Sequence, residues 1–276
     1  MKTLVRIVAY LVFAVGLAVS IASTWTTTHL ADEAGFVENA AAIGSDDQVR
    51  RTVVNVASAQ FAAKIPLGPA ISTQVASVTS KALTKVINAP EFDSAWNDSM
   101  RRTHQIQFSS GTAPEILTVD LAPFVDLAID QNALLSNLGV SAPDQVLVTV
   151  GDVKVNQYVG LITAAAEKRL LAIAVTVIAG LVALFASPQR RLGSTLAVLG
   201  TLAVLVTLVS AIAARTASTW AVNQVLASHR EWAGIVRPIG DIAVESMDAM
   251  LVPIGAAGLL AAAAGSVWRA ISARQR

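Results

Sequence analysis

The sequence has 276 residues, of which 54% are hydrophobic and only 14% are charged. A soluble domain is about 25% charged, so a large part of this chain does not face water. The net charge of +1 argues against a nucleic-acid-binding protein, and the absence of cysteine excludes disulfides, thiolate metal sites and cysteine nucleophiles.

Residues 1–23 are predicted to form an N-terminal transmembrane anchor. The apolar stretch from Ile7 to Ala22 follows Lys2 and Arg6 at the start of the chain. Ser20 and Ala22 also fit the small-residue cleavage site of a signal peptide. We favour a retained anchor, because the apolar stretch is long for a signal peptide and nothing else in the first part of the chain would hold it to a membrane.

Residues 24–169 are expected to form one extracytoplasmic domain that is mostly helical. The segment contains 15 acidic and 10 basic side chains, so its surface would attract cations or basic partners. An exported surface also needs charge simply to remain soluble. Two β-rich runs, at residues 115–120 and 145–150, predict a small two-stranded element. Between them we expect a helix capped by Asp120 and ended by Gly139, and after Val153 a helix that enters the second span.

One face of the helix predicted from Asn88 to about Phe108 is the candidate site for a ligand or partner. Phe92, Trp96 and His104 recur at multiples of four residues and therefore share that face, while Arg101 lies off it. The alternative interpretation is a buried aromatic stripe that ends in a locally hydrogen-bonded histidine. Aromatic stripes at helical spacing usually pack in a core.

Residues 170–215 predict a transmembrane hairpin. Two uncharged apolar stretches, Leu170–Ser187 and Leu192–Ala214, are separated only by Pro188-Gln-Arg-Arg191. Each stretch is close to the roughly 20 residues that a helix needs to cross a bilayer core of about 30 Å. The turn between them is too short to be a domain.

Residues 216–248 are predicted to be a second extracytoplasmic segment. Its helical pattern extends the third span, and we expect Pro238 and Gly240 to break the helix before Asp241 starts a short new one. The segment would then return over the membrane surface.

Residues 249–276 predict a fourth transmembrane helix and a basic cytoplasmic tail. The span contains Gly258, Ala261, Ala262 and Gly265, which form pairs of small residues four positions apart. Such pairs let two helices approach closely. They serve packing within one chain and oligomerisation equally well.

The charge distribution predicts that both termini are cytoplasmic and that the main domain is extracytoplasmic. With four spans, the N-terminal tip, the turn at residues 188–191 and the C-terminal tail lie on one side. These pieces contain seven basic residues, whereas all 19 acidic residues fall within residues 24–169 and 215–248. Basic residues collect on the cytoplasmic side of membrane proteins.

The sequence contains no arrangement that we interpret as catalytic, cofactor-binding or metal-binding. The three histidines lie on separate segments, and no HExxH, GxSxG, Walker or GxGxxG spacing occurs. Asp126 and Asp130 lie one helical turn apart, a spacing that paired carboxylates can have, but we favour a solvated helix face as their explanation. The spans contain no ionisable side chain except Tyr10, which disfavours an ion-coupled transporter.

Several short motifs resemble a group of multi-pass membrane proteins of unassigned activity that is common in actinobacteria. The motifs are Pro90-x-Phe92-x-x-x-Trp96 with Arg102 and His104, Val119-Asp120-Leu121 before a helix, and the Arg190-Arg191 turn. The resemblance covers most of the chain. It implies an N-terminal span, a helical outer domain and a cluster of C-terminal spans, and it implies a location rather than an activity.

Together these features predict a mainly α membrane protein with four transmembrane helices, a helical extracytoplasmic domain and a small two-stranded β element. We expect a non-enzymatic accessory or assembly subunit of a cell-envelope complex, whose outer domain binds a membrane protein or a second copy of the chain. The alternative is a transporter or lipid-handling protein that uses a groove between the spans and the outer domain.

Overall fold

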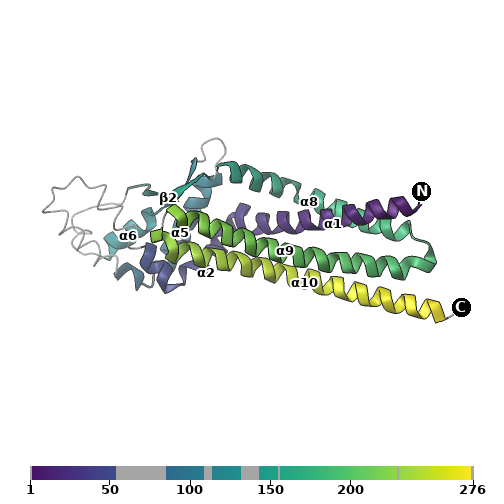
Figure 1. Cartoon of the computed structure of the whole chain (residues 1–276). Coiled ribbons are helices and arrows are strands. Elements are labelled where there is room, and N and C mark those ends of the chain that lie inside the picture. Colours follow the sequence, from purple (N-terminus) through teal and green to yellow (C-terminus); the bar gives the residue numbers. More distant parts are fainter. Residues whose placement is uncertain are drawn as a thin grey trace. The chain divides into compact units, whose positions relative to one another are not determined.

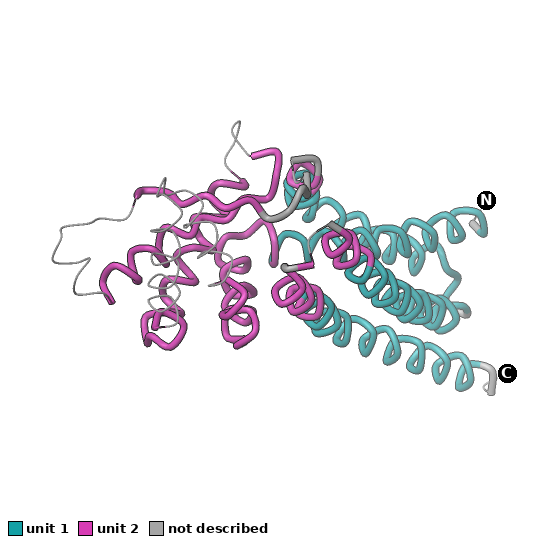
Figure 2. The backbone as a smooth tube through the Cα atoms, turned by 60° about the vertical axis from the view of Figure 1, so that its left-hand side comes forward, with its two compact units in different colours: residues 1–28, 162–219, 243–276 teal, residues 29–161, 220–242 magenta. Residues whose placement is uncertain are grey.

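The chain is mainly helical and carries one small sheet (Figure 1). The computed structural model describes residues 2–53, 85–108, 114–131, 143–154, 156–228 and 230–274. These residues divide between two compact units (Figure 2). Unit 1 comprises residues 1–28, 162–219 and 243–276, and unit 2 comprises residues 29–161 and 220–242.

Four helices are long and apolar enough to cross a membrane, as predicted. They are α1 (Lys2–Thr26), α8 (Asn156–Phe185), α9 (Leu192–Ser228) and α10 (Ala233–Arg274). In hydrocarbon a helix satisfies its backbone polar groups internally, which is why uncharged runs rich in Ala, Leu and Val fold this way. Leu170 is 71% exposed and Leu260 is 72% exposed. These outward apolar side chains fit a lipid environment, so the chain is a membrane protein by composition.

Within unit 1 both chain ends lie at the same end of the helices (Figure 1). The short 3-10 turn η2 (Gln189–Arg191) joins α8 to α9, and it lies at that end too. The basic pieces of the sequence therefore gather at one end of this unit.

The predicted break at Pro238 and Gly240 is wrong. Both residues lie inside α10, which continues from Ala233 into the fourth span, and Asp241 is helical as well. Pro238 falls in the second turn of α10, where it removes one backbone hydrogen bond. The helix nevertheless continues through it into the apolar fourth span.

Unit 2 begins with helices whose N-termini are capped by aspartates. A short π-helix, η1 (Thr27–Ala31), precedes α2 (Glu33–Gly44). The Asp32 carboxylate accepts a hydrogen bond from the Gly35 N–H at 2.9 Å. Residues 47–53 are also helical. There the Asp46 carboxylate accepts hydrogen bonds from the N–H groups of Gln48 and Val49 and so caps this helix.

The sheet of unit 2 has two antiparallel strands, β1 (Ile116–Asp120) and β2 (Leu147–Lys154). Thr118 pairs with Thr149, and Asp120 pairs with Leu147. Val153, where we expected a helix to begin, lies in β2, and α8 begins only at Asn156. Between the strands, α6 (Ala122–Asp130) ends earlier than expected. Gly139, the predicted end of that helix, lies outside the described residues.

The core of unit 2 forms around α5 (Phe92–Phe108). The rings of Phe92, Trp96 and Phe124 contact one another, with Phe92 and Phe124 at a centroid distance of 5.3 Å. Trp232, from the 3-10 turn η3 (Arg230–Trp232), joins this cluster. Large aromatic side chains dominate core energetics, so this cluster holds the helices and the sheet of unit 2 together.

Candidate functional site

Three of the four residues of the candidate site on α5 are buried. Phe92 is fully inaccessible, Trp96 is 5% exposed and His104 is 6% exposed. Their side chains pack in the interior of unit 2, as the alternative interpretation of the stripe described. Only Arg101 offers an exposed side chain to a partner.

Trp96 joins α5 to α2 through its polar edge. The indole N–H donates a hydrogen bond to the carbonyl oxygen of Ala40 at 2.6 Å. Gly44, at the end of α2, lies directly against the ring, because a Cβ atom there would be 2.6 Å from Nε1. A glycine is therefore required for this approach of the two elements.

His104 binds the end of the π-helix η1. Its Nε2 lies 3.1 Å from the carbonyl oxygens of both Leu30 and Ala31, so this nitrogen carries the hydrogen. Carbonyls at a helix end lack an internal partner, and the imidazole supplies one. The ring also stacks on Phe108 at 4.5 Å and contacts Phe36 at 5.2 Å. The histidine therefore acts as a structural group.

Arg101 belongs to a network of surface charges between α2 and α5. Its guanidinium lies 2.5 Å from the Asp98 carboxylate and 3.6 Å from that of Glu33. The Gln105 amide donates to Glu33 at 3.1 Å. These groups face solvent, where they are available to a partner but contribute little to stability.

A second stripe on α5, which sequence reasoning missed, bonds to the backbone of β1. The Ser99 hydroxyl donates to the Asp120 carbonyl. The Thr103 hydroxyl accepts from the Asp120 N–H at 3.1 Å, and the Gln107 amide donates to the Thr118 carbonyl at 3.2 Å. The helix thus supplies the edge of β1 with partners that a third strand would otherwise provide.

The Asp120 side chain ties three segments of unit 2 together. Its Oδ1 accepts hydrogen bonds from the N–H groups of Ala122, at 3.0 Å, and Val146, at 2.9 Å. Its Oδ2 lies 3.8 Å from the guanidinium of Arg102, which also donates to the Asp144 carbonyl. Asp120 is 1% exposed, so these contacts compensate a buried charge. The position of Asp120 directly before a predicted helix indicated its contact with that helix. Nothing in the sequence indicated its contact with Val146.

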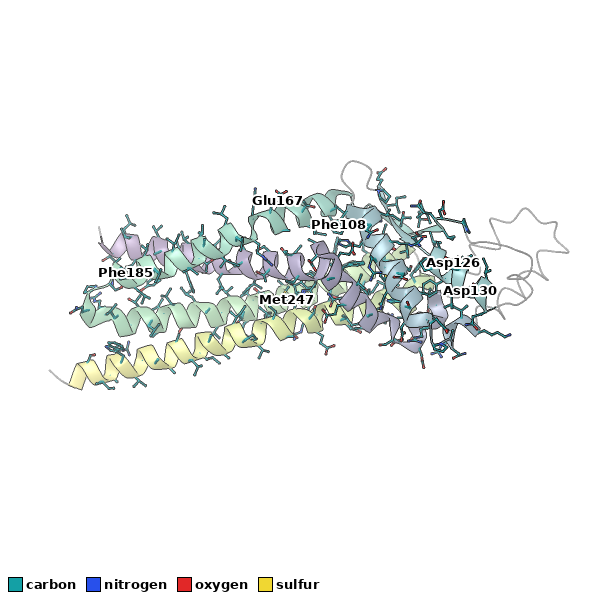
Figure 3. All side chains as sticks on the ribbon, turned by 180° about the vertical axis from the view of Figure 1, so that it is seen from behind. Phe108, Asp126, Asp130, Glu167, Phe185 and Met247 are labelled. Carbon is teal, nitrogen blue, oxygen red and sulfur yellow. The ribbon has the colours of Figure 1, made fainter. Side chains whose placement is uncertain are left out.

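The other carboxylates singled out from the sequence lie at the surface. Asp126 and Asp130 are exposed on α6 (Figure 3). Among the residues that the structure describes, no three His, Asp or Glu side chains are grouped so that they could hold a metal ion. Exposed carboxylates of this kind can attract a cationic surface.

Three of the four predicted packing residues of the fourth span contact α9 of the same chain. A Cβ atom on Gly200 would lie 2.5 Å from the Gly258 carbonyl oxygen and would also overlap the Ala262 backbone. A Cβ atom on Gly265 would lie 2.5 Å from the Gly193 carbonyl oxygen. Gly258, Ala262 and Gly265 therefore let α9 and α10 pack backbone to backbone. Ala261 is partly exposed.

Polar contacts also join the helices of unit 1. The hydroxyls of Ser20 and Thr176 share a hydrogen bond of 3.1 Å between α1 and α8. An ion pair between Arg215 of α9 and Asp248 of α10 joins those two helices.

An apolar groove lies on the surface of unit 1 between α1 and α8. It has a volume of ≈ 510 Å³. Its lining includes Leu11, Val15 and Val19 from α1 and Lys168, Leu171 and Val175 from α8. This groove is not the one expected between the spans and the outer domain, which stays a prediction.

Comparison with protein-family models, with curated proteins and with solved structures found no match. The predicted resemblance to actinobacterial membrane proteins therefore has no support from these comparisons.

Proposed function

We propose that this chain is a non-enzymatic accessory or assembly subunit of a cell-envelope complex, and that unit 2 binds its partner outside the cytoplasm. Both termini are cytoplasmic in this proposal. The gathering of the chain ends and the η2 turn at one end of unit 1 supports that orientation, because these pieces carry seven basic and no acidic residues.

The observation that carries the proposal is the division of polar groups within unit 2. The buried groups of Trp96, His104 and Asp120 are engaged with the backbone and hold the fold. In contrast, Asp126 and Asp130 are exposed. Buried groups already bonded to the backbone are not free to bind a substrate, whereas exposed charges can recognise a partner.

The partner that we favour is a membrane protein with a basic surface where it meets unit 2, because a second copy of this chain would present the same acidic surface. Residues 24–169 contain five more acidic than basic side chains. Complementary charge steers two proteins together and disfavours partners of the same sign. Such an interaction weakens as salt screens the charges.

The test is cross-linking in intact cells followed by purification in a mild detergent. We expect a stoichiometric partner whose recovery falls at high salt and in the double variant Asp126→Asn/Asp130→Asn. The matched control is Glu245→Gln, which removes an exposed carboxylate of unit 1. Repeated recovery of the chain alone, together with measurable turnover or transport, would contradict the proposal.

A further inference from the structure

We propose that the groove on α1 and α8 holds an acyl chain of a bilayer phospholipid, and that the lipid phosphate pairs with Lys168. This ligand site lies within unit 1. It goes beyond the partner binding proposed for unit 2 and does not depend on it.

The walls of the groove are two helical stripes. Leu11, Val15 and Val19 repeat every four residues along α1, and Lys168, Leu171 and Val175 follow a spacing of three and four along α8. Apart from Lys168, the lining side chains are apolar, so the groove suits an apolar occupant.

Gly16 sets the depth of the groove. Gly16 is part of the lining, and a Cβ atom there would lie 2.6 Å from the Thr176 hydroxyl oxygen. The two helices therefore come close together at Gly16, and the branched side chains on either side stand above this floor. The shape is a shallow channel that follows the helices rather than an enclosed cavity.

The groove is long and apolar. From Leu11 to Val19 it extends for about 12 Å along α1. Its walls stay apolar over this length, so an extended acyl chain can lie along it and bury its surface.

Lys168 supplies charge complementarity at one end. It lies two residues before Leu170, where the uncharged part of the span begins, so its ammonium is at the level of lipid head groups. Within the described chain Lys168 has no hydrogen-bond or ion-pair partner, and its side chain is exposed. Neighbouring Glu167 is not part of the lining. A lysine in this position binds phosphate as a point charge.

The experiment uses the full chain in vesicles of phosphatidylcholine that contain phosphatidylglycerol with a photoactivatable group on its acyl chain. After illumination and digestion, mass spectrometry locates the labelled residues. We expect the label on residues 11–19 and 168–175. Val175→Trp fills the groove and should remove most of this label. Val177→Trp changes the same residue type at an exposed position outside the groove, so it should leave the label in place.

Lys168→Gln tests the head-group contact separately. We expect labelling in this variant to fall about fivefold, the factor that corresponds to about 1 kcal/mol for one lysine at a membrane surface. Arg169→Gln is the matched control, because Arg169 does not line the groove. Thermal unfolding of each variant in the same vesicles shows whether its fold is intact.

Three outcomes would overturn the proposal. The first is a label spread evenly over the exposed apolar faces of all four spans. The second is an equal effect of Lys168→Gln and Arg169→Gln. The third is a groove occupied by protein, detected when a photocrosslinker placed at Val175 captures another polypeptide instead of lipid. The label pattern of the unaltered chain decides the first outcome even if a variant does not fold.

Discussion

The indole nitrogen of Trp96 lies 2.6 Å from the carbonyl oxygen of Ala40, deep in unit 2. This bond makes the most conspicuous side chain of the α5 stripe a structural link between α5 and α2. A partner that approaches α5 therefore meets exposed charged groups such as Arg101 rather than Phe92 and Trp96.

Gly44→Ala should destabilise unit 2, because the new methyl group overlaps the Trp96 ring. We expect a loss of about 1–3 kcal/mol in the free energy of unfolding, typical of overpacking a core. Hydrogen exchange of α2 and α5 would report it. The control is Gly160→Ala, where no atom lies within 4 Å of the new Cβ. There we expect no loss, or a gain of up to about 1 kcal/mol from the higher helix propensity of alanine. Equal effects at the two glycines would contradict this account.

Asp120→Ala should release residues 143–146 from β1. The change leaves the N–H groups of Ala122 and Val146 without their acceptor, and each buried unsatisfied donor costs about 1–3 kcal/mol. Asp120→Asn keeps an acceptor oxygen and should cost less. Hydrogen exchange at the Val146 amide measures the difference. Unchanged protection at Val146 in the alanine variant would show that the carboxylate does not hold this segment.

Gly200→Ala should weaken the pairing of α9 with α10. Its new methyl group would overlap the backbone at Gly258 and Ala262, which cannot move without separating the helices. We expect a loss of about 1–3 kcal/mol, seen as a lower midpoint of thermal unfolding in detergent. Gly255→Ala is the control, because its nearest contact is the Thr207 hydroxyl at 3.3 Å and a side chain can give way. A larger effect at Gly255 than at Gly200 would count against the backbone contact.

Exchanging the charges of Arg215 and Asp248 should preserve the stability of the α9–α10 pair. Each single change, Arg215→Asp or Asp248→Arg, places like charges together between α9 and α10. The double change restores an opposite pair. Because both side chains are partly exposed, we expect a coupling energy of at most about 1 kcal/mol that decreases with salt. A double-mutant cycle on the unfolding midpoint measures it, and a coupling of zero at low salt would mean that the pair does not form.

The spans and the α5 stripe could be predicted from the sequence because each depends on a local signal. An uncharged run such as Leu192–Ala214 is long enough to identify a membrane helix, and the spacing of Phe92 and Trp96 identifies a buried helix face. The break at Pro238 was predicted wrongly, because α10 accommodates the loss of one backbone hydrogen bond there and continues into the fourth span.

The bonds from α5 to β1 could not be predicted in the same way. Ser99, Thr103 and Gln107 are polar residues at a spacing of four, which equally describes a solvent-facing stripe. Their role depends on β1 lying beside α5, a tertiary arrangement that the helix sequence does not encode. The α1–α8 groove likewise depends on which faces meet at Gly16 and Thr176.

The orientation of the chain underlies the proposed envelope function, and its absence of cysteine makes the orientation directly measurable. Single cysteines introduced by Asp126→Cys in unit 2 and by Gln189→Cys in the α8–α9 turn can be treated in intact cells with a maleimide that does not cross membranes. We expect labelling of Asp126→Cys in intact cells and of Gln189→Cys only after permeabilisation. Labelling of Gln189→Cys, but not of Asp126→Cys, in intact cells would place unit 2 in the cytoplasm and contradict the account.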